Sequence, residues 1–322
     1  MIDCKEERKT PITFVALVVC TCKRTKMLKD CILSANEVIL PCDIKAQIIV
    51  IDNDPECSAR EIVNENAQHI RIPIVYASEP RRGISNARNK GLEEAIKSGA
   101  SHILFFDDDE TLTADTLISH IELYNKNKAA LISAGPTISK FDENYPDYIK
   151  KHMVFKQRTT KKTGDIRTSC AAGNVFFPVT LVKENGLRFS DEYVFMGGED
   201  GDFFHKASEL GFTIVWNNEA VIYETVPAAR ANMKYILKKC YYNGYASAYY
   251  KFKNSKKTLK KSIYILKTVL VLFINLFSLI LSLFCGSAVF FNTLGRTVRS
   301  KGKIDGAIKN TPYNFYKEIY GE

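Results

Sequence analysis

The chain has 322 residues, of which 46% are hydrophobic and 25% charged, a composition typical of a folded protein with one large domain or two smaller ones. Its nine cysteines follow no disulfide or zinc-finger frame, which argues against a disulfide-stapled scaffold and indicates a reducing compartment. The net charge is +9, but residues 1–229 carry 28 basic and 33 acidic side chains, and the rest carries 17 basic and three acidic ones. This mildly acidic body with a strongly basic tail predicts an anionic partner for the tail.

A short N-terminal tail, residues 1–11, precedes the apolar run "ITFVALVVC" at residues 12–20. A signal peptide has a similar apolar core. However, acidic residues precede this run, and "TCKRTK" follows it without a small-residue cleavage site. The run therefore predicts a buried first strand.

Short apolar runs and helical patterns then alternate along the chain. The runs "AQIIVIDND", "IPIVYAS" and "SHILFFDDDE" are typical of buried parallel strands, and the helical patterns cover residues 25–38, 85–98 and 113–127, the last with a Thr113 cap. This alternation predicts a doubly wound α/β sheet, in which ligands bind beyond the carboxyl ends of the strands. Those ends carry Thr21, Asp52 and the acidic residues 107–110.

The middle of the chain, residues 135–174, has weak periodicity and is interpreted as loops with short strands. A helix is predicted over residues 199–210, where apolar residues line one face and Gly211 follows. The segment "FTIVWNNEAVIYE" after it indicates one or two strands.

The composition changes at residue 230. Residues 230–262 are basic and rich in tyrosine, and the uncharged stretch 268–295 lies within a hydrophobic segment, residues 263–295. A buried core helix is the alternative, but basic, aromatic flanks favour membrane association with anionic lipids. Both flanks are positive, including the C-terminal tail 296–322, so a single span and a re-entrant hairpin broken near residues 285–287 both remain open. No nucleic-acid partner is expected.

Four consecutive acids follow the strand "SHILFF". Asp107 and Asp109 form a D-x-D pair, and such carboxylates bind Mg²⁺ or Mn²⁺ and share the ion with a diphosphate. The alternative is a solvated acidic loop that caps the next helix. Upstream, "EPRRGISNARNKG" places Arg81, Arg82 and Arg88 around a helix start, where backbone N–H groups favour anions.

Six segments in order resemble a glycosyltransferase of family 2 with the GT-A nucleotide-sugar fold. They are the first strand ending in "CTCKR", then "IIVIDND", "RGISNARNKG", "FFDDDE", "AAGNVFF" and "GGEDGDF". The resemblance covers about residues 12–225, and the domain it implies extends over residues 12–229. The following basic segment is similar to the tail of polysaccharide-assembly members.

The resemblance implies roles for individual residues. Those predicted to contact the donor nucleotide-sugar are Thr21, Asp52, Arg82, Arg88, Asp107, Gly173 and Asn174. Thr21 and Asp52 would hold the base and ribose, although a structural turn after the strand also explains Asp52. Gly173 and Asn174 match the place where the backbone passes close to the sugar, and a simple turn is again the alternative.

The metal ligands implied are Asp107, Asp109 and Glu224. Glu224 stands where many members have a histidine, and an ion pair with Arg230 is its alternative role. Glu199 and Asp200 match the family's "ED" pair at a helix start. An inverting transfer needs a general base for the acceptor hydroxyl, and Asp200 is predicted to be that base, with Glu199 orienting it or contacting the acceptor. Ordinary acids in a first helical turn are the alternative, above all for Asp202.

The sequence thus predicts an inverting, metal-dependent glycosyltransferase. The donor is expected to be a UDP-sugar and the acceptor a lipid-linked glycan or polysaccharide at the cytoplasmic face of the cell membrane. Two alternatives are a metal-dependent nucleotidyltransferase and a non-catalytic membrane-bound scaffold. The absence of glycine from "VVCTCKRTK" argues against the first, since such enzymes carry a Gly-rich phosphate loop there.

Overall fold

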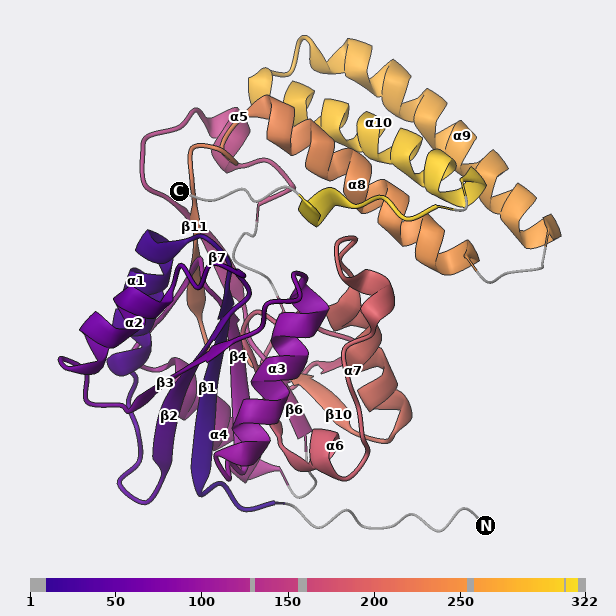
Figure 1. The fold of residues 1–322 in the computed structure, drawn as a ribbon. Helices are drawn as coiled ribbons and strands as arrows, with labels where there is room; N and C mark the ends of the chain where they lie inside the picture. Colours follow the sequence, from indigo (N-terminus) through magenta and orange to yellow (C-terminus); the bar gives the residue numbers. More distant parts are fainter. Residues whose placement is uncertain (1–9, 128–130, 156–160, 254–257, 310, 318–322) are drawn as a thin grey trace, which may run out of the picture. The chain divides into compact units, whose positions relative to one another are not determined.

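Strands and helices alternate through the first half of the chain, as predicted, and build a mixed sheet (Figure 1). The computed structural model describes residues 10–127, 131–155, 161–253, 258–309 and 311–317. The predicted N-terminal tail lies outside the described residues except for its last two. The chain divides into unit 1, Met1–Lys140 with Arg158–Thr225, and unit 2, Phe141–Gln157 with Val226–Glu322.

The main sheet of unit 1 has eight strands in the order β3-β2-β1-β4-β9-β6-β10-β8. Its strands are β1 (Phe14–Thr21), β2 (Lys45–Asp52), β3 (Ile74–Ser78), β4 (His102–Asp107), β6 (Leu131–Ala134), β8 (Ile166–Arg167), β9 (Val175–Pro178) and β10 (Thr213–Trp216). Strand β1 is parallel to β2 and β4, whereas β9 is antiparallel to β4 and β6. The first apolar run is therefore a central strand, as predicted.

Helices cover both faces of this sheet. They are α1 (Thr25–Asn36), α2 (Arg60–Ala67), α3 (Ile84–Lys97), α4 (Thr116–Lys126), α6 (Thr180–Lys183) and α7 (Glu199–Glu209), with a 3₁₀ turn, η1, at Asp191–Tyr193. Alternate residues of β1 enter opposite cores. Val18 packs in the cluster that contains Leu92 of α3, and Leu17 in the cluster that contains Leu28 of α1. This alternation explains why the strand is apolar at nearly every position.

A second sheet of three strands lies beside the acidic turn of unit 1. It consists of β5 (Glu110–Leu112), β11 (Ile222–Val226) and β7 (Thr137–Phe141), in the order β5-β11-β7. Its antiparallel register sets Glu224 opposite Glu110, and the N–H of Thr225 donates to the carbonyl of Asp109 over 2.8 Å. The segment "FTIVWNNEAVIYE" thus supplies one strand to each sheet.

One predicted boundary is wrong. The helix expected from Thr113 begins at Thr116, because the N–H of Thr113 donates to Thr116 Oγ1 over 2.9 Å in a turn that precedes the helix. The N-cap residue is Asp115, which makes no side-chain cap hydrogen bond.

Unit 2 is helical. Its elements are α5 (Asp147–Lys150), α8 (Met233–Phe252), α9 (Thr258–Ser282), α10 (Ser287–Ile308) and the 3₁₀ turn η2 (Phe315–Lys317). Helices α8 and α10 pack backbone to backbone: a Cβ on Gly302 would overlap the carbonyl oxygen of Tyr241, and one on Gly306 that of Tyr245. Small residues permit this close packing. The loop 141–157 belongs to this unit, a grouping that the continuous predicted boundaries did not anticipate.

Candidate active site

Arg88 of α3 joins two acids that lie 92 positions apart in the chain. Its Nη2 donates to Asp107 Oδ1 at the end of β4 over 3.0 Å, and its Nη1 donates to Glu199 Oε1 at the start of α7. The guanidinium also lies 5.7 Å from the ring centroid of Phe189. The first acid of the D-x-D pair and the first acid of the "ED" pair are therefore brought together.

The link is buried, which sets its electrostatics. Burial raises the pKa of Glu199 to about 7, and the positive charge of Arg88 opposes this rise. Burial alone would lower the pKa of Arg88, but Glu199 and Asp107 raise it, so the guanidinium keeps its charge. Glu199 Oε2 is buried without a hydrogen-bond partner among the described residues. That oxygen can carry a proton, or it can accept a hydrogen bond from a ligand.

A second arginine neutralises the rest of the acidic turn. Nη1 of Arg24 lies 2.8 Å from Asp108 Oδ1 and 3.5 Å from Asp109 Oδ2, and the hydroxyl of Thr21 donates to Asp108 Oδ2 over 2.8 Å. Burial raises the pKa of Asp108, and Arg24 opposes the rise. Thr21 and Asp108 thus hold the turn together. Sequence reasoning missed Arg24, although "CTCKR" at the end of β1 was the signal.

Gly173 lies directly against the acidic cluster. A Cβ at this position would lie 2.8 Å from Glu110 Oε1 and 3.1 Å from Asp107 Oδ2. Glu110 is fully buried and accepts the N–H of Asp107 over 2.9 Å. A side chain at residue 173 would therefore displace the carboxylate of Glu110 and crowd that of Asp107.

Asn174 and Asp52 use their side chains inside the fold. Asn174 has a φ of 65°, accepts a hydrogen bond at Oδ1 from His120 Nε2 over 2.9 Å, and donates from Nδ2 to two backbone carbonyls. Asp52 is fully buried and accepts hydrogen bonds from Asp54 N–H, Ala59 N–H and Tyr76 Oη. These contacts favour the structural turns that were the alternatives for both residues, and a nucleotide contact by either stays a prediction.

A free acceptor does exist at the end of β2. Asp54 is 1% exposed, and its Oδ2 has no hydrogen-bond partner among the described residues. Its Oδ1 lies 3.8 Å from Lys23 Nζ, and Lys23 follows β1 with a φ of 57°. Sequence reasoning missed this residue, because Asp52 comes first after the apolar run.

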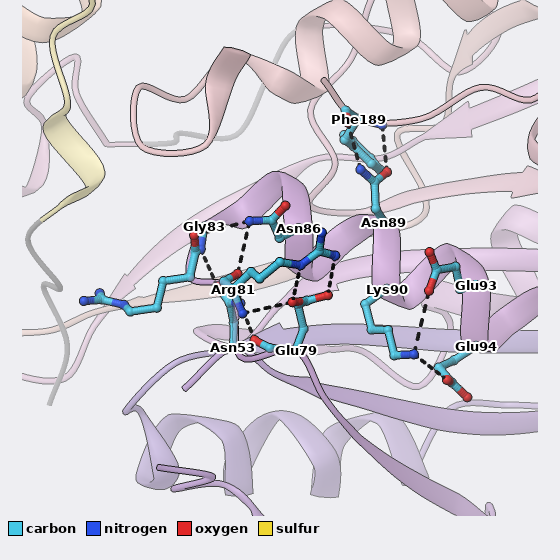
Figure 2. Close-up of polar contacts among 11 residues, drawn as sticks. Asn53, Glu79, Arg81, Gly83, Asn86, Asn89, Lys90, Glu93, Glu94 and Phe189 are labelled. Atoms are coloured by element: carbon cyan, nitrogen blue, oxygen red, sulfur yellow. Dashed lines mark hydrogen bonds and ion pairs between the residues drawn. The ribbon is translucent and has the colours of Figure 1, made fainter. Parts of the chain in front are cut away.

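The loop before α3 is fixed by local contacts (Figure 2). Arg81 pairs with Glu79 over 2.9 Å, and Asn53 donates to the carbonyls of residues 79 and 81 and accepts the N–H of Gly83. Arg82 is exposed beside this loop. Of the three arginines in the motif, Arg88 is buried in the acidic link, Arg81 is paired on the surface, and Arg82 faces solvent.

Asp200 stands next to the buried link at the start of α7. Two glycines with positive φ, Gly197 at 77° and Gly198 at 97°, turn the chain into the helix. Asp200 Oδ1 accepts the N–H of Gly201 over 2.7 Å, and Oδ2 accepts no hydrogen bond from the described residues. Asp202 instead pairs with Lys206 over 2.7 Å, which supports the structural alternative for it.

The residues predicted to hold a metal form no complete cage. No group of three or more His, Cys, Asp or Glu side chains is arranged for a metal among the residues that the structure describes. The Asp107 side chain is 38% exposed, whereas that of Asp109 is 8% exposed beside Arg24. Glu224 accepts from Ser139 Oγ over 3.4 Å. Since Mg²⁺ binds through one or two carboxylates plus substrate phosphates, the exposed carboxylate of Asp107 fits an ion that arrives with a diphosphate.

Two family models match the sequence of this chain. The sequence model of the family "Glycosyl transferase family 2" matches residues 16–186. The chain belongs to glycosyltransferase family 2. A second model, "Glycosyl transferase family group 2", matches residues 102–294. The family 2 glycosyltransferase is 30% identical over 226 residues to the succinoglycan biosynthesis protein ExoM of Rhizobium meliloti, covering 70% of this chain and 71% of ExoM.

Solved structures share the fold of this family 2 glycosyltransferase. Residues 1–349 of S. aureus TarS in complex with UDP give a TM-score of 0.51 at 15% identity, covering 89% of this chain and 90% of that one. The match to a longer TarS chain spans 39% of its length. The mannosyltransferase PcManGT of Pyrobaculum calidifontis, with GDP-Man and Mn²⁺, gives a TM-score of 0.53 at 17% identity and covers 75% of this chain and 66% of PcManGT. The predicted GT-A fold is confirmed.

Proposed function

We propose that this glycosyltransferase is an inverting, metal-dependent enzyme that uses a UDP-sugar donor. The observation that carries the proposal is the link made by Arg88, which sets an acid of the D-x-D turn against the acid beside the predicted base. A donor that binds at the D-x-D turn would therefore lie next to Asp200. Membership of the family removes the two alternatives, a nucleotidyltransferase and a non-catalytic scaffold.

The nucleotide end of the donor would lie at the carboxyl ends of β1 and β2. There Asp54 has a buried, unpaired oxygen, which suits an N–H of a base or a ribose hydroxyl. It is a better acceptor than Asp52, whose oxygens are occupied. UDP in a structural neighbour of similar length supports uridine as the nucleoside.

Asp107 and Asp109 would hold Mg²⁺ or Mn²⁺ together with the donor diphosphate, with Glu224 on the neighbouring strand. The ion would neutralise negative charge on the leaving diphosphate. Mn²⁺ and GDP-Man in PcManGT support a divalent ion with a nucleotide-sugar. Arg82 is exposed at the edge of the site and is the arginine left to approach the phosphates.

Asp200 would take the proton of the acceptor hydroxyl as that oxygen attacks the anomeric carbon and the bond to the diphosphate breaks. Its open Oδ2 and half-buried position suit a group that must meet both water and substrate. Glu199 would keep its neighbour in place through Arg88. A single displacement of this kind inverts the anomeric configuration and needs no covalent enzyme intermediate.

The acceptor is proposed to be a lipid-linked glycan or growing polysaccharide at the cytoplasmic face of the cell membrane. ExoM acts in succinoglycan biosynthesis, which supports polysaccharide assembly. Helix α9 is long and apolar enough to cross a membrane, and little of it is buried. The basic, Tyr-rich α8 would lie near anionic lipid headgroups.

The test is a donor screen with the full-length protein. We expect release of UDP from a UDP-sugar only when Mg²⁺ or Mn²⁺ is present, and no release of pyrophosphate. Equal UDP release with excess chelator would contradict the metal dependence. Turnover with GDP-sugars alone would contradict the choice of nucleoside.

A further inference from the structure

The two faces of α9 have the reverse of the polarity expected for a helix in water. Its two fully buried side chains are polar: Thr268 is 6% exposed and Ser282 is 2% exposed. From Thr268 onward its exposed side chains are apolar, and Phe284 just beyond the helix is 86% exposed. A helix in water hides its apolar stripe, so this arrangement fits an outer medium of hydrocarbon.

After α9 the chain turns back, and α10 packs beside α9 (Figure 1). The turn lies at Cys285 and Gly286, where Gly286 has a φ of 91°. Asn275 Nδ2 of α9 donates to Ser300 Oγ of α10 over 3.1 Å. The glycine contacts of α10 then bring its second half against α8. The chain after residue 295 therefore lies on the same side as the chain before α9.

Charge divides this hairpin into a tip and a collar. Residues 276–295 form the tip, which carries no charged side chain. The collar follows on α10, where Arg296, Arg299 and Lys301 are exposed. Because Asn275 lies beside Ser300, the part of α9 before Asn275 runs along the charged half of α10. Beyond the collar, Phe291 and Asn292 contact Tyr148 and Met153 of the loop 141–157. The part of the tip that projects past this loop is therefore residues 276–290.

The length of the tip sets how deep it reaches. From Arg296 back to Gly286 the helix rises about 15 Å, at about 1.5 Å per residue. The hydrocarbon core of a bilayer is about 30 Å thick. Even the full length of the tip is therefore no more than one leaflet, and it is too short to take the collar across two.

We propose that α9 and the first half of α10 form a re-entrant hairpin that inserts into one leaflet of an anionic membrane. The outward apolar tip enters the hydrocarbon, and the basic collar meets the headgroups. The chain then enters and leaves the membrane on one face, which decides between the two topologies that the sequence left open. The inference extends the membrane attachment proposed above and does not depend on the transfer reaction, because its test measures topology and binding rather than turnover.

The first experiment places one tag at the N-terminus and another at the C-terminus of the full chain, in sealed inside-out membrane vesicles. We expect a protease added outside to remove both tags. If the C-terminal tag is protected and the N-terminal tag is cleaved, the helix spans the bilayer and the proposal fails. If high salt releases the protein from these vesicles, the collar binds only the surface and the proposal also fails.

The second experiment compares Phe284→Asp with Ile166→Asp in flotation with vesicles of phosphatidylcholine and phosphatidylglycerol. Ile166 is a matched control, since it is 75% exposed but lies in unit 1. We expect Phe284→Asp to weaken vesicle binding at least about tenfold, because an aromatic side chain leaves the hydrocarbon. The control should bind as the wild type does. Equal binding by both variants, or loss of self-association by Phe284→Asp without loss of vesicle binding, would overturn the proposal.

Discussion

Replacing Arg88 tests the central link of the site. Arg88→Met leaves Glu199 buried without its cation, so Glu199 will take up a proton, since its pKa is already about 7 with Arg88 present. Wild-type Glu199 is itself protonated at pH 5 and ionises only above pH 7, so both proteins bear the same cost of a neutral Glu199 at pH 5. Above pH 7 only the variant must still hold the acid neutral, at about 1.4 kcal/mol per pH unit. The loss of stability on breaking the buried pair, about 3 kcal/mol at pH 5, should therefore be about 1 kcal/mol larger at pH 8.

The sign of this pH dependence is fixed. A carboxyl whose pKa is raised in the folded state contributes stability that is present below its unfolded pKa and is lost as the pH rises through its folded pKa. Guanidinium unfolding can be followed by the fluorescence of Trp216, the single tryptophan, which lies in β10 of unit 1. The exposed Arg81 serves as the control, and Arg81→Met should change stability by less than about 1 kcal/mol.

The double variant Arg88→Met/Glu199→Gln should lose the extra pH dependence, because glutamine cannot titrate. A loss for Arg88→Met that is equal at the two pH values, or larger at pH 5, would refute the reasoning. Arg88→Lys keeps a charge but cannot bridge two acids, so its kcat should fall about 100-fold with little change in UDP affinity. A change in UDP affinity alone would instead support the predicted contact between Arg88 and the diphosphate.

Three further variants test other parts of the molecule. Asp200→Asn should leave UDP binding unchanged and lower kcat at least about 100-fold, measured by UDP release, because the proton acceptor is lost; near-normal turnover would exclude Asp200 as the base. Asp109→Asn should abolish the Mn²⁺-dependent part of UDP binding in calorimetry, and metal-dependent binding at wild-type strength would remove it from the ligand set. Gly302→Val should lower stability by about 3 kcal/mol or more, because its side chain would overlap Tyr241 of α8; an unchanged melting curve would contradict this helix packing.

Patterns local in sequence predicted the fold well. The β-branched runs gave the strands at the centre of the sheet, and the helical spacing gave α1, α3 and α7 to within two residues at nearly every boundary. The sheet then placed Asp107 at a strand end, where the acids were expected. The start of α4 was missed because Thr113 and Asp115 are both good cap residues, and only the hydrogen bond from Thr113 N–H to Thr116 Oγ1 shows that Thr113 lies in a turn before the helix.

Contacts between residues that lie far apart in the sequence could not be predicted from it. The four acids in a row called for a positive charge, and a bound metal was the predicted source. The structure supplies Arg24 and Arg88 as well, each more than ten positions from the acids it neutralises. Likewise nothing in "IDND" shows that the Asp52 carboxylate accepts hydrogen bonds from the following loop, whereas one oxygen of Asp54 is left without a partner among the described residues. Such assignments depend on which backbone N–H groups the folded loop presents.

The loop 141–157 has a consequence for how this enzyme is divided and evolves. It interrupts the catalytic unit in sequence yet packs with the helices, where Tyr148 stacks near Phe291 and Met153 N–H donates to Asn292 Oδ1. The polypeptide therefore passes between the two units three times rather than once. Removal of the C-terminal helices would leave this loop without its packing partners and would expose Ile149 and Phe155. Recombination at a single point in the chain therefore cannot exchange the helical unit as an intact module.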